Sequence, residues 1–398
     1  MTFLPLYKVN PMNFADLGLG PALLSAIERA KYESPYPIQV EAIPAILHGK
    51  DLLGLAPTGS GKTAAYILPI LQQLLQKEAP RDRSVPVLVL VPTRELAVQV
   101  AEVAENFGRF LPRRIKSLAI FGGVSINPQM MKLGGTEILI ATPGRLIDLM
   151  GRNSVSISRI QTLVIDEADK MLQMGFKEEI DHLFEYIPRK KQTLLFSATM
   201  EGEVEELIKK LLQNPVRVQV AADDFTPDSI TQSAYRVSPE AKGPFLRQVI
   251  QSGDWKQILV FASSIRTADN IVGKLIKNGI DAVAFHGDKS QGARTEALAR
   301  FKSGKTRVLV ATDLAARGID IQALPLVINY ELPRSPKDYI HRIGRTGRAG
   351  MQGQAISLIT PEEQHHFKVI QKKMGKWVTL VNAEDFGKGE DRSFDSAK

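Results

Sequence analysis

The stretch Ala56–Thr63 constrains the fold of this chain more than any other part of its sequence. A short apolar run at residues 51–55 precedes it, and apolar residues at helical spacing follow from Ala64 to Leu74. A strand, a Gly-rich loop and a helix in this order are the setting of a phosphate-binding loop. The strict pattern has Gly where this chain has Ala56, so an ordinary Gly-rich turn is the alternative interpretation.

The residue types in this loop suit a nucleoside triphosphate. Gly59 and Gly61 allow backbone N–H groups to surround an oxyanion, and the N-terminus of the following helix adds positive potential. We expect Lys62 to reach the β- and γ-phosphates and the Thr63 hydroxyl to bind Mg²⁺. By itself, the loop predicts only that the chain binds a nucleoside triphosphate.

Length and composition indicate a globular protein of two domains. The 398 residues exceed one typical core, and two domains of about 200 residues each are expected. The sequence has no apolar run near the ~20 residues that a membrane span requires, and prolines interrupt any signal peptide. The net charge of +8 and the pI of about 9.4 favour a polyanionic partner. The absence of cysteine excludes disulfides and thiol catalysis and fits an intracellular, cytoplasmic enzyme.

Short apolar runs alternate with helical patterns along the whole chain. Runs such as 87–91, 138–141 and 193–196 predict a doubly wound α/β domain with a mostly parallel sheet. The alternation repeats from residue 258 to residue 359, without a second phosphate loop. We therefore predict two α/β domains with the boundaries 1–219 and 229–375, a linker at 220–228 and a short tail at 376–398.

An acidic cluster, Asp166–Asp169, directly follows an apolar run about one hundred residues after Lys62. A carboxylate at the end of such a strand holds Mg²⁺ beside the terminal phosphates, which is the role expected of Asp166. Glu167 is placed to orient and deprotonate the attacking water. An acidic surface loop is the alternative, but the phosphate loop makes the catalytic interpretation stronger.

A basic cluster, His341–Arg348, contains three arginines and a histidine within eight residues. A guanidinium delivered to the γ-phosphate stabilises the transition state of phosphoryl transfer. Because the second half lacks a phosphate loop, we expect it to supply such an arginine across a cleft. A basic turn that binds nucleic-acid phosphates is the alternative.

Taken together and in this order, these motifs resemble those of the DEAD-box ATP-dependent RNA helicases of superfamily 2. The resemblance covers about residues 14–372 and includes Ala56, which is the family's own form of the loop. Tyr32–Gln39 resembles the adenine-reading Q motif. The resemblance implies two tandem RecA-like domains, RNA-stimulated ATP hydrolysis coupled to cleft closure, and local unwinding of short duplexes. The compact chain resembles bacterial members, and we expect a monomer.

The resemblance also assigns roles residue by residue. For ATP and Mg²⁺ it implies Phe14, Tyr32, Gln39, Thr58, Gly59, Ser60, Gly61, Lys62, Thr63, Asp166, Gly318 and Asp320, with Glu167, Arg345 and Arg348 in catalysis. For the RNA backbone it implies Pro92, Thr93, Arg94, Gly122, Gly123, Thr142, Pro143, Gly144, Arg145, Gln291, Arg294, Thr312 and Asp313. Ser197, Thr199 and His341 would couple hydrolysis to strand separation. Most of these RNA residues suit phosphates and sugars, so binding is expected to be largely independent of sequence.

Two positions depart from the Q-motif pattern. Lys31 stands where the family usually has Gly, and Tyr36 replaces a small hydroxyl residue. The second change leaves open how this segment is tied to the phosphate loop.

Alternative functions share these motifs. An ATP-gated RNA clamp would differ from a helicase only in slow product release, and a DNA translocase fits the Thr-Pro-Gly-Arg and Asp-Glu-Ala-Asp forms poorly. The sequence does not identify the RNA target, and ribosome assembly, RNA decay and cold adaptation remain open.

Overall fold

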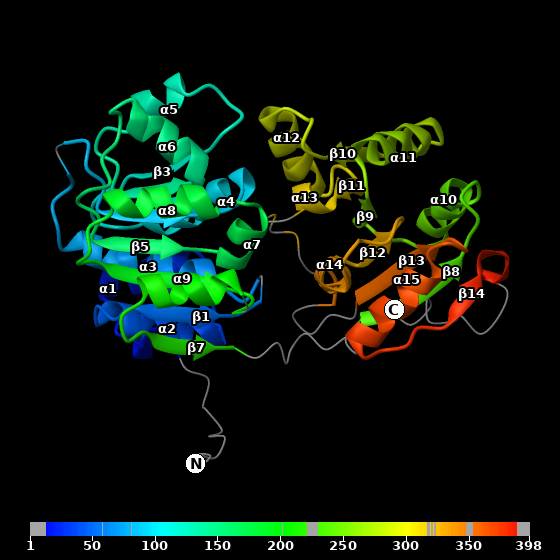
Figure 1. Ribbon diagram of the computed structural model, residues 1–398, viewed down its shortest axis with the longest axis horizontal. Coiled ribbons are helices and arrows are strands. Elements are labelled where there is room, and N and C mark those ends of the chain that lie inside the picture. The colour runs from blue at the N-terminus through cyan, green and yellow to red at the C-terminus, as the bar shows by residue number, and fades with distance from the viewer. Residues whose placement is uncertain are drawn as a thin grey trace, which may run out of the picture. The chain divides into compact units, whose positions relative to one another are not determined.

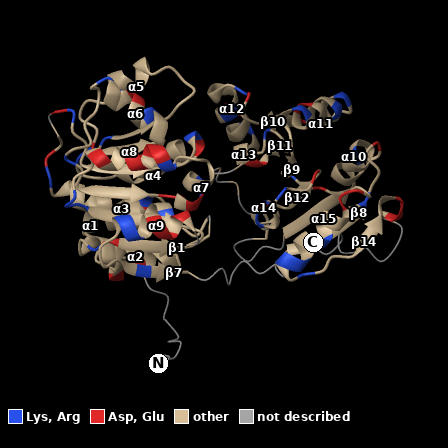
Figure 2. Cartoon of the chain, viewed as in Figure 1, with Lys and Arg blue, Asp and Glu red and all other residues tan. Residues whose placement is uncertain are grey.

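The computed structural model describes residues 13–57, 59–80, 82–200, 202–220, 230–316, 319, 321, 324–347 and 353–387. The chain divides into two compact units, Met1–Ala221 and Ala222–Lys398 (Figure 1). Basic and acidic residues occur on the elements of both units (Figure 2). Within the described ranges, no helix combines the length and the apolar character that a membrane crossing requires.

The first unit is built on a parallel sheet. Its described residues form seven strands in the order β3-β4-β2-β5-β6-β1-β7. The strands are β1 (Leu52–Leu55), β2 (Val87–Leu90), β3 (Ser117–Ile120), β4 (Ile138–Ala141), β5 (Thr162–Ile165), β6 (Gln192–Ser197) and β7 (Val216–Gln219). Since all strands run the same way, the loops that follow them gather at one edge of the sheet.

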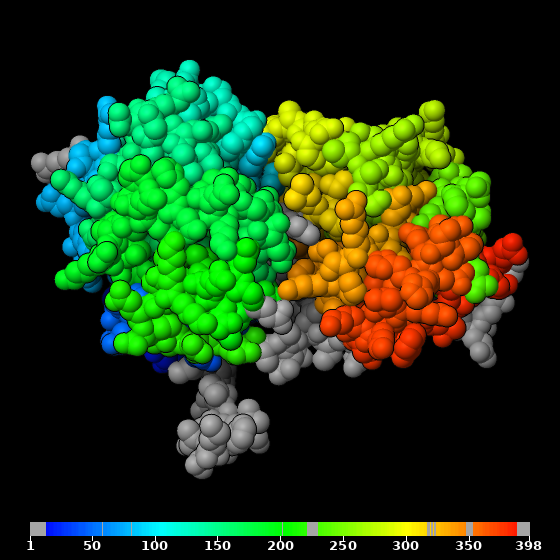
Figure 3. All heavy atoms as spheres, in the orientation of Figure 1, coloured from blue at the N-terminus to red at the C-terminus, as the bar shows by residue number. Residues whose placement is uncertain are grey.

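Helices cover both faces of this sheet. They are η1 (Phe14–Leu17), α1 (Pro21–Arg29), α2 (Pro37–Leu47), α3 (Lys62–Leu75), α4 (Arg94–Gly108), α5 (Asn127–Lys132), α6 (Pro143–Gly151), α7 (Ala168–Gln173), α8 (Lys177–Tyr186) and α9 (Glu203–Leu211). Helices α1–α4 pack on the face that carries Val87 and Val89, and α6–α9 on the face of Leu88 and Leu90. Side chains of α8 and α9 cover the near face of this unit in Figure 3. Burial on both faces explains the unbroken apolar runs.

The second unit repeats this topology. Its described residues form seven strands in the order β10-β11-β9-β12-β13-β8-β14, the same order with every strand number raised by seven. The strands are β8 (Ile230–Arg236), β9 (Ile258–Ala262), β10 (Ala282–Phe285), β11 (Val308–Thr312), β12 (Leu326–Asn329), β13 (Gly353–Ile359) and β14 (Leu380–Asn382). The predicted α/β class and the repeat of the first half in the second are confirmed.

The second sheet also lies between two layers of helices. They are α10 (Lys242–Ser252), α11 (Ile265–Lys277), α12 (Gln291–Lys302), α13 (Asp313–Ala316), α14 (Pro336–Ile343) and α15 (Gln364–Met374), with η4 (Ala383–Asp385) near the end. Residues of α10 and α11 pack on one face of the strands, and residues of α12–α15 pack on the other.

The segment expected to be a short tail belongs in part to the second sheet. Strand β14 pairs in parallel with β8, and Phe386 packs edge-on against Tyr235 and Phe245 at 5.4 Å and 5.3 Å between ring centroids. Its sequence, with mixed charges and only a three-residue strand, carries no periodic signal. The remainder of that tail, from residue 388, and the predicted linker residues 221–228 lie outside the described residues.

An ion pair between half-buried Arg113 and buried Glu137 holds the end of α3, the helix that follows the phosphate loop. The Arg113 guanidinium donates to both carboxylate oxygens of Glu137 at 2.8 Å and 2.9 Å, and to the backbone carbonyls of Leu74 and Lys77. The Glu137 side chain is only 2% exposed. Arg113 therefore satisfies a buried charge and two carbonyl groups at the C-terminal end of α3.

We predict that Arg113→Ala lowers the free energy of unfolding by about 3 kcal/mol, because Glu137 is left buried without its partner. Urea denaturation followed by far-UV circular dichroism measures the loss. The matched control is Arg159→Ala, which removes an exposed pair with Asp82 and should cost less than about 1 kcal/mol. Equal losses in the two variants would contradict a special role for the pair with Glu137.

Candidate functional site

The phosphate loop has the local geometry that its sequence predicts. It connects β1 to α3, and Gly59 and Gly61 adopt φ angles of 83° and 86°, which side chains with a Cβ rarely tolerate. The Ser60 hydroxyl donates to the Pro57 carbonyl at 2.8 Å. The Lys62 ammonium is buried and donates to the Ala56 carbonyl at 2.9 Å. In this structure the Lys62 side chain therefore folds back and bonds to the loop that precedes it.

The Q-motif segment is tied to the phosphate loop through Gln39. The fully buried Gln39 accepts from the Tyr36 backbone N–H at 3.0 Å and donates to the Gly61 carbonyl at 3.0 Å. A Cβ on Gly61 would lie 2.5 Å from the Gln39 amide nitrogen and 2.9 Å from the Tyr36 ring. Gln39 and the Tyr36 ring thus provide the connection that the sequence leaves open.

The aromatic residues expected near adenine differ in their exposure. Phe14 is 2% exposed and belongs to the core of the first unit, so its ring has no free face in this structure. Tyr32 is 36% exposed, and its ring packs against Phe107 with 5.0 Å between centroids. Of these two residues, Tyr32 alone presents ring surface to a ligand.

The sheet order brings the predicted catalytic motifs together. Strand β6 lies between β1 and β5, so the phosphate loop, Ser197 and Asp166 follow three adjacent strands at one edge. The Ala56 N–H donates to the Ser197 carbonyl at 3.1 Å, which extends the β1–β6 pairing into the phosphate loop. Residues separated by more than one hundred positions in sequence are therefore neighbours in the fold.

Asp166 is a buried carboxylate with one oxygen engaged. It is 2% exposed, and its Oδ2 accepts from the Tyr66 hydroxyl at 2.9 Å. Burial raises the pKa of Asp166 above its ordinary value, and the nearby positive charge of Lys62 opposes this shift. Oδ1 is buried without a hydrogen bond from any described residue.

A magnesium ion fits this donor set. Mg²⁺ is usually bound through one or two carboxylates together with substrate phosphates and waters. The described residues contain no group of three or more His, Cys, Asp and Glu side chains suited to a metal. Within these ranges, therefore, protein side chains do not form a complete coordination shell. The Asp166 Oδ1 atom and the Thr63 hydroxyl are the groups that would hold the ion beside nucleotide phosphates.

Glu167 is held in an unusual backbone conformation. Its φ of 54° and ψ of 48° lie in the left-handed region, which costs a residue other than Gly on the order of 1 kcal/mol or more. Its Oε1 accepts from the Lys170 ammonium at 2.7 Å, and both side chains are more than 90% buried. The surrounding fold therefore fixes the direction of this carboxylate.

The acidic motif is joined to the Ser-Ala-Thr motif after β6. The Ala198 N–H donates to Asp169 Oδ1 at 3.5 Å. The Ser197 hydroxyl donates to the Thr199 carbonyl at 2.6 Å and accepts from the Thr199 N–H at 3.3 Å. A single hydrogen bond, from a backbone N–H to the Asp169 side chain, thus links Asp166–Asp169 with Ser197–Thr199.

The candidate RNA residues of the first unit follow three adjacent strands. Strand β4 lies between β3 and β2, and the segments that follow these strands are 122–123, 142–145 and 92–94. A Cβ on Gly123 would lie 2.1 Å from the Arg94 guanidinium, and the Arg145 guanidinium donates to the Val124 carbonyl at 2.8 Å. The two arginines thus hold the loop after β3. The sites expected in this group are Pro92, Thr93, Arg94, Gly122, Gly123, Thr142, Pro143, Gly144 and Arg145.

The candidate residues of the second unit also follow neighbouring strands. Gln291 begins α12, and the buried Arg294 guanidinium lies 4.9 Å from the Phe285 ring centroid. Thr312 ends β11, which is adjacent to β10. Both Asp313 carboxylate oxygens accept from Arg342, at 2.5 Å and 2.6 Å, which engages that carboxylate within the unit.

The arginines of the basic cluster have different environments. Arg342 is 2% exposed and also donates to Asn329 Oδ1 at 3.1 Å and to the Glu331 carbonyl at 2.6 Å. Arg345 is 7% exposed and donates to the Ile319 carbonyl at 2.7 Å. His341 is exposed on α14. Arg342 therefore stabilises the fold of the second unit. The sequence motif alone does not distinguish it from the other arginines of the cluster.

Four predicted site residues lie outside the described residues: Thr58, Gly318, Asp320 and Arg348. Two further residues of the site, Tyr66 and Lys170, have no motif of their own and are found only in the structure. Arg342 belongs to the basic cluster, but its own role is visible only in the structure. A polar or charged residue at an otherwise apolar helical position is the one sequence signal that Tyr66 and Arg342 carry.

Comparisons with known proteins agree with this geometry. A family profile described as DEAD/DEAH box helicase matches residues 36–207, and one described as helicase conserved C-terminal domain matches residues 241–350. The ATP-dependent RNA helicase CshA of Limosilactobacillus reuteri is 40% identical over 91% of this chain and 72% of its own length. The ATP-dependent RNA helicase DeaD of Escherichia coli K12 is 40% identical over 94% of this chain and 60% of its own length.

A solved structure is similar across both units. S. cerevisiae Dbp5 bound to RNA and ADP BeF3 has a TM-score of 0.82 and 33% sequence identity, covering 94% of this chain and 97% of that one. Two tandem RecA-like sheets and the matched motifs therefore agree with the sequence relatives. The chain belongs to the family of DEAD-box ATP-dependent RNA helicases.

Proposed function

We propose that this chain is an RNA helicase that hydrolyses ATP in a reaction stimulated by RNA, and that it unwinds short duplexes or remodels RNA–protein complexes. The observation that carries the proposal is the meeting of Lys62, Asp166 and Ser197 at the ends of β1, β5 and β6. The phosphate-binding group, the carboxylates and the coupling motif thus share one edge of one sheet.

In the proposed reaction, Lys62 exchanges its hydrogen bond to the Ala56 carbonyl for the terminal phosphates of ATP. Asp166 and Thr63 would hold a magnesium ion, which when bound would neutralise phosphate charge. Glu167 orients the attacking water and takes its proton. Lys170, which donates to Glu167 Oε1, keeps that carboxylate in place. Gln39 and Tyr32 recognise the adenine.

The second unit contributes positive charge in this proposal. Arg345 and Arg348 stabilise the charge that develops on the transferred phosphoryl group, Asp320 contacts the ribose, and Gly318 belongs to the same nucleotide-binding segment. Arg345 then has to leave the carbonyl of Ile319, which it contacts in this structure. Because ATP-binding motifs occur in both units, hydrolysis requires closure, and RNA and ATP strengthen each other's binding.

RNA recognition in this proposal is largely independent of sequence. The candidate groups are hydroxyls, guanidinium groups and Gly backbone, which suit phosphates and 2′-hydroxyls better than base edges. The crystallised relative Dbp5 was bound to RNA and ADP BeF3. We further infer a monomer that works in the cytoplasm, and sedimentation of the protein at assay concentration tests the first of these points.

The test is the steady-state ATPase rate without nucleic acid, with single-stranded RNA and with DNA of matched sequence. Strong stimulation by RNA and little by DNA is expected. Lys62→Ala should lose at least about 100-fold in rate, because it removes a preorganised donor to the phosphates. Lys50→Ala, an exposed lysine before β1, is the matched control. A rate that RNA does not change would contradict the proposal.

We predict that Glu167→Gln still binds ATP and RNA but hydrolyses ATP at least about 100-fold more slowly, since an amide cannot accept the proton of the attacking water. Binding of a fluorescent nucleotide and single-turnover hydrolysis separate the two effects. Glu178→Gln, on the exposed surface of α8, should hydrolyse ATP normally. Rapid turnover by Glu167→Gln would remove the role as general base.

We predict that Arg345→Ala lowers the turnover rate by about 1000-fold while ATP affinity changes little, because the guanidinium acts on transition-state charge. Arg345→Lys, which keeps the charge but loses the planar fork, should remain strongly impaired. Exposed Arg334 provides the control variant Arg334→Ala. If Arg345→Ala weakens RNA binding alone, the residue belongs to the RNA site instead.

A further inference from the structure

Tyr66 places a hydroxyl group beside Asp166, a predicted ligand of magnesium. It lies three residues after Thr63 on α3, and therefore on the same face of the helix. Its hydroxyl donates to Asp166 Oδ2 at 2.9 Å. One buried hydroxyl thus connects α3 with the end of β5.

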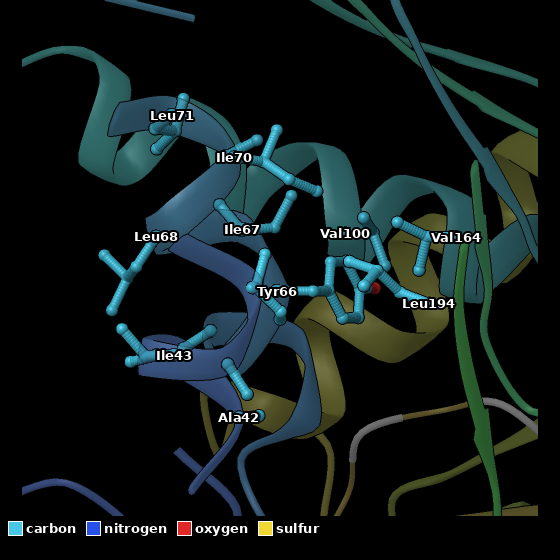
Figure 4. Close-up of a cluster of buried hydrophobic side chains, with 14 of the residues drawn as sticks. Ala42, Ile43, Tyr66, Ile67, Leu68, Ile70, Leu71, Val100, Val164 and Leu194 are labelled. Atoms are coloured by element: carbon cyan, nitrogen blue, oxygen red, sulfur yellow. The ribbon is translucent and has the colours of Figure 1, made fainter. Parts of the chain in front are cut away.

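The ring of Tyr66 is fixed by its packing. It is fully buried, and it points from α3 toward Val100, Val164 and Leu194 (Figure 4). On another side it packs against Phe196, with 5.3 Å between ring centroids and 44° between the planes. Because the ring cannot move freely, its hydroxyl is held at a constant position.

Gly54 makes room for this packing. A Cβ on Gly54 would lie 2.5 Å from the Phe196 ring, a distance that real contacts do not reach. The absence of a side chain in the middle of β1 therefore lets Phe196 lie close to the strand, where it supports Tyr66. The arrangement Gly54–Phe196–Tyr66–Asp166 runs from the sheet to the carboxylate.

The hydroxyl has no packing advantage of its own. Phenylalanine would fill the same space and bury no hydroxyl. Burying a hydroxyl costs free energy unless a hydrogen bond replaces its lost hydration. What the hydroxyl adds is a directed hydrogen bond to Asp166.

We propose that Tyr66 is a positioning residue for magnesium, because its hydroxyl donates to Asp166 Oδ2 and thereby presents Oδ1 to the ion. This inference rests on the proposed ATPase function. Oδ1 is a buried carboxylate oxygen to which no described residue donates, as expected of an atom that binds a ligand. Partners that orient a metal ligand in this way typically change metal affinity by about 10–100-fold when they are removed.

The test compares wild type with Tyr66→Phe, which keeps the ring and removes the hydroxyl. Binding of a fluorescent ADP analogue is measured in EDTA and over a Mg²⁺ titration, and Mn²⁺ binding to the ADP complex is followed by electron paramagnetic resonance. Metal-free nucleotide affinity should be unchanged, while affinity for the divalent ion falls about 10-fold. The Mg²⁺ concentration for half-maximal ATPase rate should rise by a similar factor.

Tyr339→Phe is the matched control. Tyr339 is another buried tyrosine, and its hydroxyl lies 3.0 Å from Ser357 Oγ in the second unit. This variant should lose a similar hydrogen bond without any change in the affinity for divalent ions. Thermal unfolding of both variants shows whether their folds are equally stable.

The outcomes separate this inference from the proposed function. An unchanged or increased affinity of Tyr66→Phe for Mg²⁺ and Mn²⁺ overturns the positioning role. An equal loss of nucleotide affinity with and without metal, or an equal loss of metal affinity in Tyr339→Phe, also overturns it. If wild type neither binds nucleotide with Mg²⁺ nor hydrolyses ATP, the proposed function itself fails. If wild type has normal ATPase activity and Tyr66→Phe has unchanged affinity for divalent ions, only the positioning role of Tyr66 is contradicted.

Discussion

Buried charge at the ends of β1, β5 and β6 is the constraint on which the first unit depends. Lys62, Asp166, Glu167 and Lys170 are all at least 93% buried, and isolated charges would be expensive to keep there. The fold offsets this cost by pairing Glu167 with Lys170, placing Lys62 near Asp166, and directing the Tyr66 hydroxyl at Asp166. Lys62 and Tyr66 both come from α3, and they meet Asp166 because β6 alone separates β1 from β5, so the site requires this strand order.

The parallel sheet explains why the motifs lie where they do. Its strands are buried on both faces, and the polar candidate residues gather in the loops at their carboxyl ends. In both units the candidate residues follow adjacent strands: β3, β4 and β2 in the first, and β10 and β11 in the second. In the second unit Arg342 bonds to Asp313, Asn329 and Glu331. These bonds attach the basic cluster to the segments that follow β11 and β12.

Much of the fold could be predicted from local pattern. Buried strands such as β2 and β4 are unbroken apolar runs, and the sequence alone locates them. Strands β3, β8 and β14 were not predicted, because their burial is partial or alternates with polar residues. Strand β14 lies within the expected tail. This segment is held by its pairing with β8 and by the packing of Phe386, which the local sequence pattern does not reveal.

By itself, the sequence determined the chemistry of this protein: the phosphate loop, the acidic motif and the basic cluster each depend on residues close together in the chain. Only the tertiary structure decided which side chains support them. Tyr66 meets Asp166 across 100 positions, Gln39 reaches Gly61 across 22, and Phe14 belongs to the core. These contacts depend on strand order and helix packing, and no short stretch of sequence specifies them.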